Sequence, residues 1–186
     1  MKQSIRIIAG QYRGKKLTFP VVDGLRPTSD RIRETVFNWL MHDIRNACCL
    51  DAFSGSGALG FEAFSRGAAQ VIMIEQNTKA FSNLKTISAS FQSPKLSVIQ
   101  ADAEDYIKQQ ALLATQQFDL IFLDPPFAKP HLLNCIPVIG NTSLLKKGGL
   151  LYLESPEEVT LDPIIWKQLK LKRAGQVVYA LYQKVP

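Results

Sequence analysis

Residues 118–127 read FDLIFLDPPF, a stretch that predicts a buried strand followed by a ligand-binding tip. Five of the six residues before Asp124 are apolar, which is typical of a parallel strand covered on both faces. Pro125 and Pro126 fix two φ angles and remove two backbone N–H groups, so carbonyl oxygens at the tip stay free to accept hydrogen bonds. Asp124, the Pro125 carbonyl and Phe127 could hold a flat base that carries an exocyclic amino group. The alternative is a strand that ends in a proline turn with a capping aspartate.

Strand-like and helix-like segments alternate on both sides of this stretch. The sequence predicts strands at 48–53, 71–75, 96–102, 119–126 and 149–154, and helices at about 59–66, 81–89, 104–114, 132–139 and 164–168. Such alternation indicates a parallel sheet with crossover helices. The last two runs, 169–174 and 176–184, meet at Gly175 and Gln176, and so short a link predicts that these strands pair antiparallel.

The N-terminal region predicts a hairpin and a helix. Residues 5–9 and 14–19 are short β-like runs around 10–14, where Tyr12 is either a turn residue or a ring that stacks on a nucleotide. Thr28 or Ser29 can cap a helix that runs to about residue 43. Its predicted buried face holds Ile32, Val36 and Leu40, and its polar face holds Arg31, Thr35, Asn38 and His42.

Length and composition predict one cytoplasmic, globular domain. The chain has 186 residues, of which 46% are hydrophobic and 20% charged, and this length suits a single core. Its apolar runs are shorter than the roughly 18 residues of a membrane span, and its start lacks the core of a signal peptide. Three cysteines and two histidines at unrelated spacings predict neither a disulfide framework, nor a metal site, nor a Ser/His/Asp triad.

Basic side chains concentrate near the N-terminus. Residues 1–45 hold nine basic and four acidic side chains, a net charge of +5 out of the +6 of the whole chain. A basic segment joined to a nearly neutral remainder indicates contact with a phosphate backbone. The alternative is a solvated surface without a partner.

A glycine turn lies between the first strand and the first helix of the alternating region. Residues 50–60 read LDAFSGSGALG, in which Gly55, Gly57 and Gly60 satisfy the dinucleotide pattern G-x-G-x-x-G. The pattern alone does not separate NAD from another adenosine cofactor. Asp51 makes the distinction, because a carboxylate four residues before Gly55 requires a cationic partner, such as the amino group of a methionine moiety, rather than a pyrophosphate.

Acidic residues end four successive predicted strands. Glu75 lies about 20 residues past the first glycine, where it can accept both hydroxyls of a ribose, and Asp102 can reach an adenine edge. Each acid alone is more often a strand-end or capping residue. The set indicates one ligand site, since ligands bind at the carboxyl ends of parallel strands. Its members are Asp51, Glu75, Asp102 and Asp124.

Several segments resemble, in their order and spacing, the class I S-adenosylmethionine (SAM)-dependent methyltransferases: LDAFSGSGALGFEAFSRGA, VIMIEQN, ADAED and LDPPF. With RIIAGQYRGKKL and RPTSDRIRETVFNWL upstream, nearly the whole chain resembles the RsmD family, bacterial enzymes that methylate the exocyclic N2 amino group of a guanine in small-subunit 16S ribosomal RNA. The resemblance implies a Rossmann-like α/β fold, with a seven-stranded, mostly parallel sheet that has one antiparallel strand, plus an N-terminal β-hairpin and helix. It also implies a single domain, 1–186, with a basic RNA-facing extension at 1–44 and a SAM-binding core at 45–186.

The resemblance further implies the residues of the site. Asp51 and the glycine turn are expected to hold the methionine end of SAM, Glu75 the ribose and Asp102 the adenine. The full expected cofactor-binding set is Asp51, Phe53, Gly55, Gly57, Glu75, Gln76, Asp102, Ala103, Arg26 and Thr28. The expected catalytic set, which receives the guanine, is Asp124, Pro125, Pro126 and Phe127. The expected RNA-binding set is Arg6, Arg13, Lys15, Lys16, Arg31 and Arg33. The expected partner is 16S rRNA, within the small ribosomal subunit or an assembly intermediate, and the protein is expected to be a monomer without metal or membrane.

Other functions are compatible with parts of the sequence. An amino methyltransferase acting on DNA adenine or cytosine, or on another RNA, would use the same motifs. An NAD-dependent oxidoreductase would satisfy the glycine pattern, and it is opposed by Asp51 and by the DPPF motif. A non-catalytic RNA-binding module could keep the fold, and it is opposed by the completeness of that motif.

Overall fold

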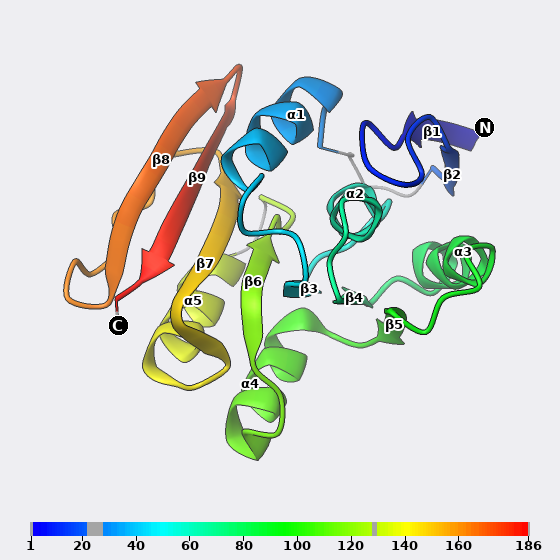
Figure 1. The fold of residues 1–186 in the computed structure, drawn as a ribbon. Helices are drawn as coiled ribbons and strands as arrows, with labels where there is room; N and C mark the ends of the chain where they lie inside the picture. Colours follow the sequence, from blue (N-terminus) through cyan, green and yellow to red (C-terminus); the bar gives the residue numbers. More distant parts are fainter. Residues whose placement is uncertain (1, 22–27, 128–129, 186) are drawn as a thin grey trace.

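The structure is a computed structural model that describes residues 2–21, 28–127 and 130–185, and it contains a small and a large β-sheet (Figure 1). The small sheet pairs β1 (Lys2–Arg6) with β2 (Lys16–Pro20) in antiparallel orientation. The large sheet has seven strands in the order β5-β4-β3-β6-β7-β9-β8. These strands are β3 (Cys48–Asp51), β4 (Gln70–Glu75), β5 (Leu96–Gln100), β6 (Phe118–Leu123), β7 (Leu145–Ser155), β8 (Trp166–Ala174) and β9 (Val177–Lys184).

One strand of the large sheet, β9, runs against its neighbours. It pairs antiparallel with β7 and with β8, whereas the pairs among β3 to β7 are parallel. This confirms the predicted seven-stranded sheet with one antiparallel strand and the predicted pairing across Gly175. The strand order reverses between β3 and β6, and in such sheets the ligand crevice opens at that point, outside the carboxyl ends of the strands.

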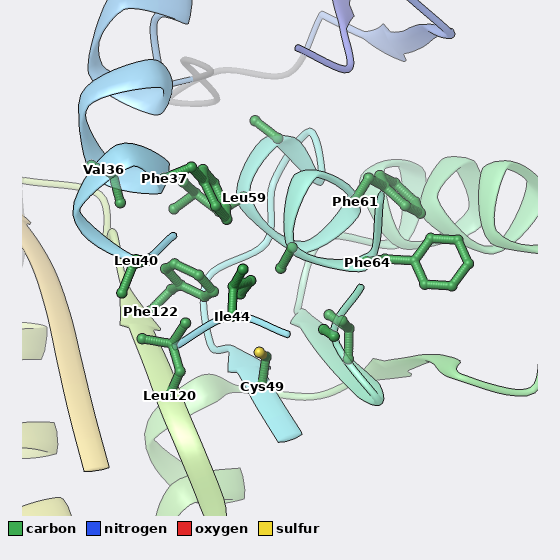
Figure 2. Packing of buried hydrophobic residues seen from close by; sticks show 14 of the residues in the cluster. Val36, Phe37, Leu40, Ile44, Cys49, Leu59, Phe61, Phe64, Leu120 and Phe122 are labelled. Carbon is green, nitrogen blue, oxygen red and sulfur yellow. The ribbon is translucent and has the colours of Figure 1, made fainter. Parts of the chain in front are cut away.

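Helices cover both faces of the large sheet. The helices α1 (Asp30–Trp39), α2 (Ala58–Ser65) and α3 (Thr78–Ala89) pack on one face, and α4 (Ala103–Leu113) and α5 (His131–Asn141) pack on the other. Figure 2 shows the first layer, in which side chains of α1 and α2 such as Phe37 and Leu59 pack over Cys49 of β3 and Phe122 of β6. None of the helices in the described residues is long and apolar enough to cross a membrane.

Two sequence predictions about helices are wrong. The N-terminal helix ends at Trp39 rather than near residue 43. The helix expected at 164–168 does not form, since 163–165 make a turn and Trp166 begins β8 opposite Lys184 of β9. Trp166 is buried in the core layer that α4 and α5 cover. Strand pairing and burial of a large aromatic ring therefore override the local helical pattern.

The hairpin formed by β1 and β2 is docked on α2 by backbone hydrogen bonds. Strand β1 begins three residues before the predicted run 5–9, and β2 begins two residues after the start of the predicted run 14–19. The loop 7–15 joins the two strands. The N–H groups of Ile8 and Ala9 donate to the Glu62 carboxylate at 2.8 and 3.0 Å, and the N–H of Gln11 donates to the Ser65 carbonyl at 2.8 Å. Gly10 has a φ of +84°, and a Cβ atom there would lie 1.9 Å from the Ser65 oxygen, so the close approach requires glycine. Contacts within the protein thus order the hairpin loop.

Tyr12 is half-buried and packs against the core. Its ring stacks on Phe64 with centroids 5.2 Å apart and meets Phe91 edge-on at 4.8 Å. Its backbone N–H donates to the Ser65 hydroxyl at 3.0 Å. These contacts make Tyr12 a packing residue of the loop, which agrees with the first of its two predicted roles.

Candidate active site

A cavity of about 1170 Å³ opens at the carboxyl ends of β3, β4, β6 and β7, beside the point where the strand order reverses. The loops 51–56, 75–77 and 124–127 line it, together with residues at the start of α1 and in the turn between β8 and β9. Each of the three loops directly follows a parallel strand. The fold therefore gathers at one place segments that are far apart in the sequence.

The glycine turn after β3 brings the backbone close to its neighbours. Gly57 precedes α2 with a φ of +79°, and a Cβ atom there would lie 2.4 Å from the ring of Phe61. Gly60 lies in the first turn of α2, where a Cβ atom would lie 2.8 Å from Met73 of β4 and 3.1 Å from the Asp51 carboxylate. Only glycine fits at either position, so α2 can start directly above β3 and leave the loop 51–56 open to the cavity.

Asp51 is a buried carboxylate beneath the start of α2. It is 1% exposed, and its Oδ2 atom accepts a hydrogen bond from the Gly60 N–H at 3.0 Å. Burial raises the pKa of Asp51 to about 7; the Gly60 hydrogen bond opposes this shift and the charge of Glu75 adds to it. Among the described residues, no lysine, arginine or histidine lies within ion-pair distance of Asp51. A ligand cation would supply the missing partner.

Glu75 joins the first and second loops of the site. Its Oε2 atom accepts from the Gly55 N–H at 2.9 Å, and its Oε1 atom accepts from the Asn77 N–H at 2.7 Å. Each carboxylate oxygen keeps a further lone pair, so Glu75 could also accept the two hydroxyls of a ribose. Gln76 follows it on the cavity wall.

Two more predicted cofactor residues line the cavity, and Asp102 does not. Phe53 lies on the wall, and its ring packs against His131 with centroids 5.1 Å apart. Ala103 also lies in the cavity wall. Asp102 is instead the N-cap of α4, where Oδ1 accepts from the N–H groups of Glu104 and Asp105 at 2.9 and 3.1 Å. Of the four strand-end acids, the structure therefore brings three into the cavity wall.

The predicted acceptor motif is assembled around Asp124. Asp124, Pro125, Pro126 and Phe127 all line the cavity, and Phe127 is 45% exposed. The Thr28 hydroxyl donates to Asp124 Oδ2 at 3.0 Å, so the segment before α1 contacts the acid itself. Burial raises the pKa of Asp124 well above its usual range, and the charge of Glu154 raises it further, against the opposing Thr28 hydrogen bond.

Glu154 is a site residue that the sequence analysis missed. It lies near the end of β7, is 3% exposed and lines the same cavity as Asp124. The Tyr152 hydroxyl donates to Glu154 Oε1 at 2.8 Å. The signal was present, because Glu154 ends the apolar run 149–153 as the other four acids end theirs.

Arg33 is a correction to the predicted RNA-binding set. Its side chain is fully buried, pairs with Asp30 at 2.6 Å and Glu62 at 3.4 Å, and donates to the Arg6 carbonyl at 2.9 Å. It cannot reach a phosphate without breaking these contacts. Arg33 therefore fastens α1 to α2 and to the hairpin.

The other basic residues of that set remain accessible. Arg6, Arg13, Lys16 and Arg31 are exposed. Lys15 is half-buried, with Nζ donating to the Ser90 hydroxyl at 2.9 Å and lying 3.8 Å from the centre of the Phe91 ring. The predicted cofactor residue Arg26 lies outside the described residues. Within the described part of the chain, no group of three or more His, Cys, Asp or Glu side chains is placed to hold a metal ion.

Known proteins resemble this chain over nearly its whole length. The family model described as conserved hypothetical protein 95 matches residues 5–183. The chain is 42% identical over 187 residues to the ribosomal RNA small subunit methyltransferase D of Haemophilus influenzae, covering 98% of this chain and 95% of that relative.

Solved structures share the fold. A putative methyltransferase yhhF from Escherichia coli superposes with a TM-score of 0.88 at 40% identity, covering 98% of this chain and 99% of that one. A putative SAM-dependent methyltransferase from Streptococcus mutans superposes with a TM-score of 0.67 at 14% identity, covering 90% of this chain and 53% of that one.

Proposed function

The chain belongs to the RsmD family, whose model is described as conserved hypothetical protein 95, and on this premise we propose that it methylates the N2 amino group of a guanine in 16S ribosomal RNA. SAM is the methyl donor. The observation that carries the proposal is the convergence of Asp51, Glu75 and the DPPF motif on one cavity. The glycine pattern taken alone would suit an NAD enzyme, and that alternative is wrong for a methyltransferase of this family.

The residues of the cavity fit SAM. Asp51 is buried without a cationic partner among the described residues and would accept the ammonium group of the methionine end. The glycines around it leave the backbone open, and Glu75 would hold the ribose. When bound, SAM supplies an electrophilic methyl group on a sulfonium sulfur.

The acceptor motif prepares the nucleophile. A guanine amino nitrogen is a weak nucleophile because its lone pair is delocalised into the ring. Asp124 and the Pro125 carbonyl would accept its two N–H groups and draw the nitrogen toward tetrahedral geometry, so that the lone pair points into the cavity. Phe127, which is exposed, would stack on the base. In the in-line displacement the bond from nitrogen to the methyl group would form as the methyl–sulfur bond breaks, and Asp124 would take the proton that the nitrogen loses. Positioning would supply most of the acceleration.

The target base must leave its stack to enter this cavity. We assign residues 1–44 to an RNA-facing extension, in which Arg6, Arg13 and Lys16 of the hairpin would contact phosphates that flank the target. The substrate would be the small ribosomal subunit or an assembly intermediate, and the protein would act as a monomer.

Methyl transfer to ribosomal particles tests the function. SAM with a labelled methyl group is incubated with small ribosomal subunits that lack the modification, and the rRNA is digested to nucleosides. Label in N2-methylguanosine is expected. Label in N6-methyladenosine or N4-methylcytosine, or label only in DNA offered as a parallel substrate, would instead favour the rival amino methyltransferase.

Asp51→Asn is expected to stabilise the free protein and to weaken SAM binding. The pKa of Asp51 is raised from 3.8 to about 7, so the folded protein binds the proton more tightly than the unfolded chain. The protonated carboxyl of Asp51 contributes stability that is fully present below pH 3.8 and is lost as the pH rises through about 7. At pH 8 the neutral amide should raise the free energy of unfolding by roughly 1 to 4 kcal/mol. SAM affinity should fall roughly 10- to 100-fold, because a charged hydrogen bond is lost.

Denaturant unfolding and calorimetric titration with SAM measure both effects. Asp105→Asn is the matched control, because Asp105 is exposed on α4 outside the cavity. A destabilised Asp51→Asn protein, or one that keeps its SAM affinity, would contradict the role of this carboxylate.

The double variant Arg13→Glu/Lys16→Glu, which reverses two charges of the hairpin, is expected to bind RNA more weakly. Its RNA affinity should also depend less steeply on the salt concentration. Each phosphate contact contributes about 0.7 to 0.9 to the slope of log affinity against log salt, so losing two contacts should lower the slope by about 1 to 2. Titration of 16S rRNA at several salt concentrations measures this. Arg45→Glu with Lys95→Glu is the control, because these exposed residues precede β3 and β5 at the opposite ends of the strands from the cavity. Equal losses in both double variants would show that only net charge matters.

A further inference from the structure

Glu154 and Asp124 lie side by side at the carboxyl ends of neighbouring strands. Leu123 of β6 is opposite Leu153 of β7. The residues that follow them, Asp124 and Glu154, therefore lie at the same level at the carboxyl edge of the sheet. Phe122 and Tyr152, two residues before Asp124 and Glu154, pack on the face covered by α1 and α2, with ring centroids 6.0 Å apart. Since side chains alternate along a strand, Glu154 is on this same face, and it lines the cavity with Asp124.

The two carboxylates have more acceptor capacity than the described residues fill. The Tyr152 hydroxyl donates to Glu154 at 2.8 Å, and the Thr28 hydroxyl donates to Asp124 at 3.0 Å. The Thr28 hydroxyl has one hydrogen to give, and it goes to Asp124. Burial raises the pKa of both carboxyls, and the charge of Glu154 raises that of Asp124 further, so N–H donors from a ligand are needed to favour their charged, accepting forms. This corner of the cavity is therefore suited to a ligand edge that carries several N–H donors.

Guanine has such an edge, and the other amino-bearing bases do not. Its N1–H and its two N2 hydrogens are adjacent donors. Adenine and cytosine place an unprotonated ring nitrogen beside their amino groups, and that nitrogen would face a carboxylate. A flipped base is read through hydrogen bonds to this edge once its pairing partner has been left behind.

We propose that Glu154 selects guanine: its carboxylate accepts the N1–H of the flipped base, while Asp124 and the Pro125 carbonyl accept the two amino hydrogens. This role rests on the proposed function and extends it to the choice of base. Tyr152 holds the carboxylate in place from the core side. Glu154 is a specificity residue, because the N1–H takes no part in the bonds that form and break.

A base analogue separates this role from that of Asp124. The base 2,6-diaminopurine carries the same amino group at C2, but its N1 is an acceptor without hydrogen. Once the methylated guanine has been mapped, 16S rRNA with guanine or 2,6-diaminopurine at that position can be ligated from fragments and reconstituted into small subunits. The wild-type protein should methylate the analogue roughly 10- to 100-fold more slowly than guanine, the usual discrimination by a paired contact to a base edge.

Glu154→Gln should remove most of this preference. A glutamine amide can accept from the guanine N1–H through its oxygen or donate to the analogue N1 through its nitrogen. The ratio of the two rates, and the ratio of equilibrium binding constants for the two RNAs, should both move toward one. Glu158→Gln is the matched control, since Glu158 is exposed on the segment after β7 and should keep the wild-type ratio. SAM titration shows whether the variant retains a folded cofactor site.

The outcomes distinguish this inference from the proposed function. Equal methylation of both RNAs by the wild-type protein would overturn guanine selection through N1–H. A wild-type preference retained by Glu154→Gln, in rate and in binding, would assign the selection to another residue. Failure of the wild-type protein to methylate guanine at N2 in any subunit preparation would overturn the proposed function instead.

Discussion

Asp124→Ala is expected to abolish methyl transfer while leaving SAM binding nearly intact. Removing one preorganised polar group that acts on the reacting atom typically costs roughly 10²- to 10³-fold in kcat. Asp124 is placed for that role, because it lines the cavity beside Pro125 and receives a hydrogen bond from Thr28 at 3.0 Å. SAM binding should persist, since Asp51 and Glu75 are the residues proposed to contact its ammonium group and its ribose.

Single-turnover methyl transfer and SAM titration measure the two quantities separately. Asp105→Ala, an exposed aspartate on α4, is the control for loss of a carboxylate. Turnover within a few-fold of wild type would remove Asp124 from the mechanism. Loss of SAM affinity as large as the loss of turnover would mean that the substitution acts through the shape of the cavity.

Glu62→Gln is expected to destabilise the protein by about 3 to 5 kcal/mol, the usual cost of breaking a buried ion pair by removing one partner. Glu62 is fully buried in α2. Its carboxylate accepts from the N–H groups of Ile8 and Ala9, from Arg33 at 3.4 Å and from Arg66 at 2.7 Å. The amide has one acceptor oxygen and directs hydrogens at donors, so the buried Arg33 charge loses one of its two carboxylate partners and keeps Asp30.

Denaturant unfolding gives the loss of stability, and hydrogen exchange locates it. Exchange at the Ile8, Ala9 and Gln11 amides should quicken more than exchange in β4 and β6, because the hairpin loop loses its anchor on α2. Glu34→Gln on the exposed side of α1 should leave both measurements unchanged. Unaltered protection of the loop amides in Glu62→Gln would show that apolar packing alone docks the hairpin.

The alternating pattern was sufficient to predict the large sheet and most of its helices. Buried parallel strands carry continuous apolar runs, and the run before Asp124 and the run 71–74 are of this kind. These signals are local, so they can be seen without the fold. The segment 164–168 was mispredicted because its state depends on pairing with β9 and on burial of Trp166, which are properties of the assembled sheet.

Charge in the sequence was a weaker guide to the site. Arg33 was predicted to bind RNA because it lies in a basic segment, yet it is fully buried against Glu62 of α2. The two residues are 29 positions apart, so the pairing leaves no local trace. Tyr12 was ambiguous for the same reason, since its partners Phe64 and Phe91 are distant in the chain.

The sequence by itself determined the fold class, the glycine turn and three of the acids that converge on the cavity, because strand ends and glycine positions are written in local residue order. The tertiary structure alone decided which charged groups are available. It turned Asp102 into a helix cap, buried Arg33 and Glu62 as a pair, and placed Glu154 beside Asp124. Burial and strand register depend on contacts between distant segments, and these contacts exist only once the chain has folded.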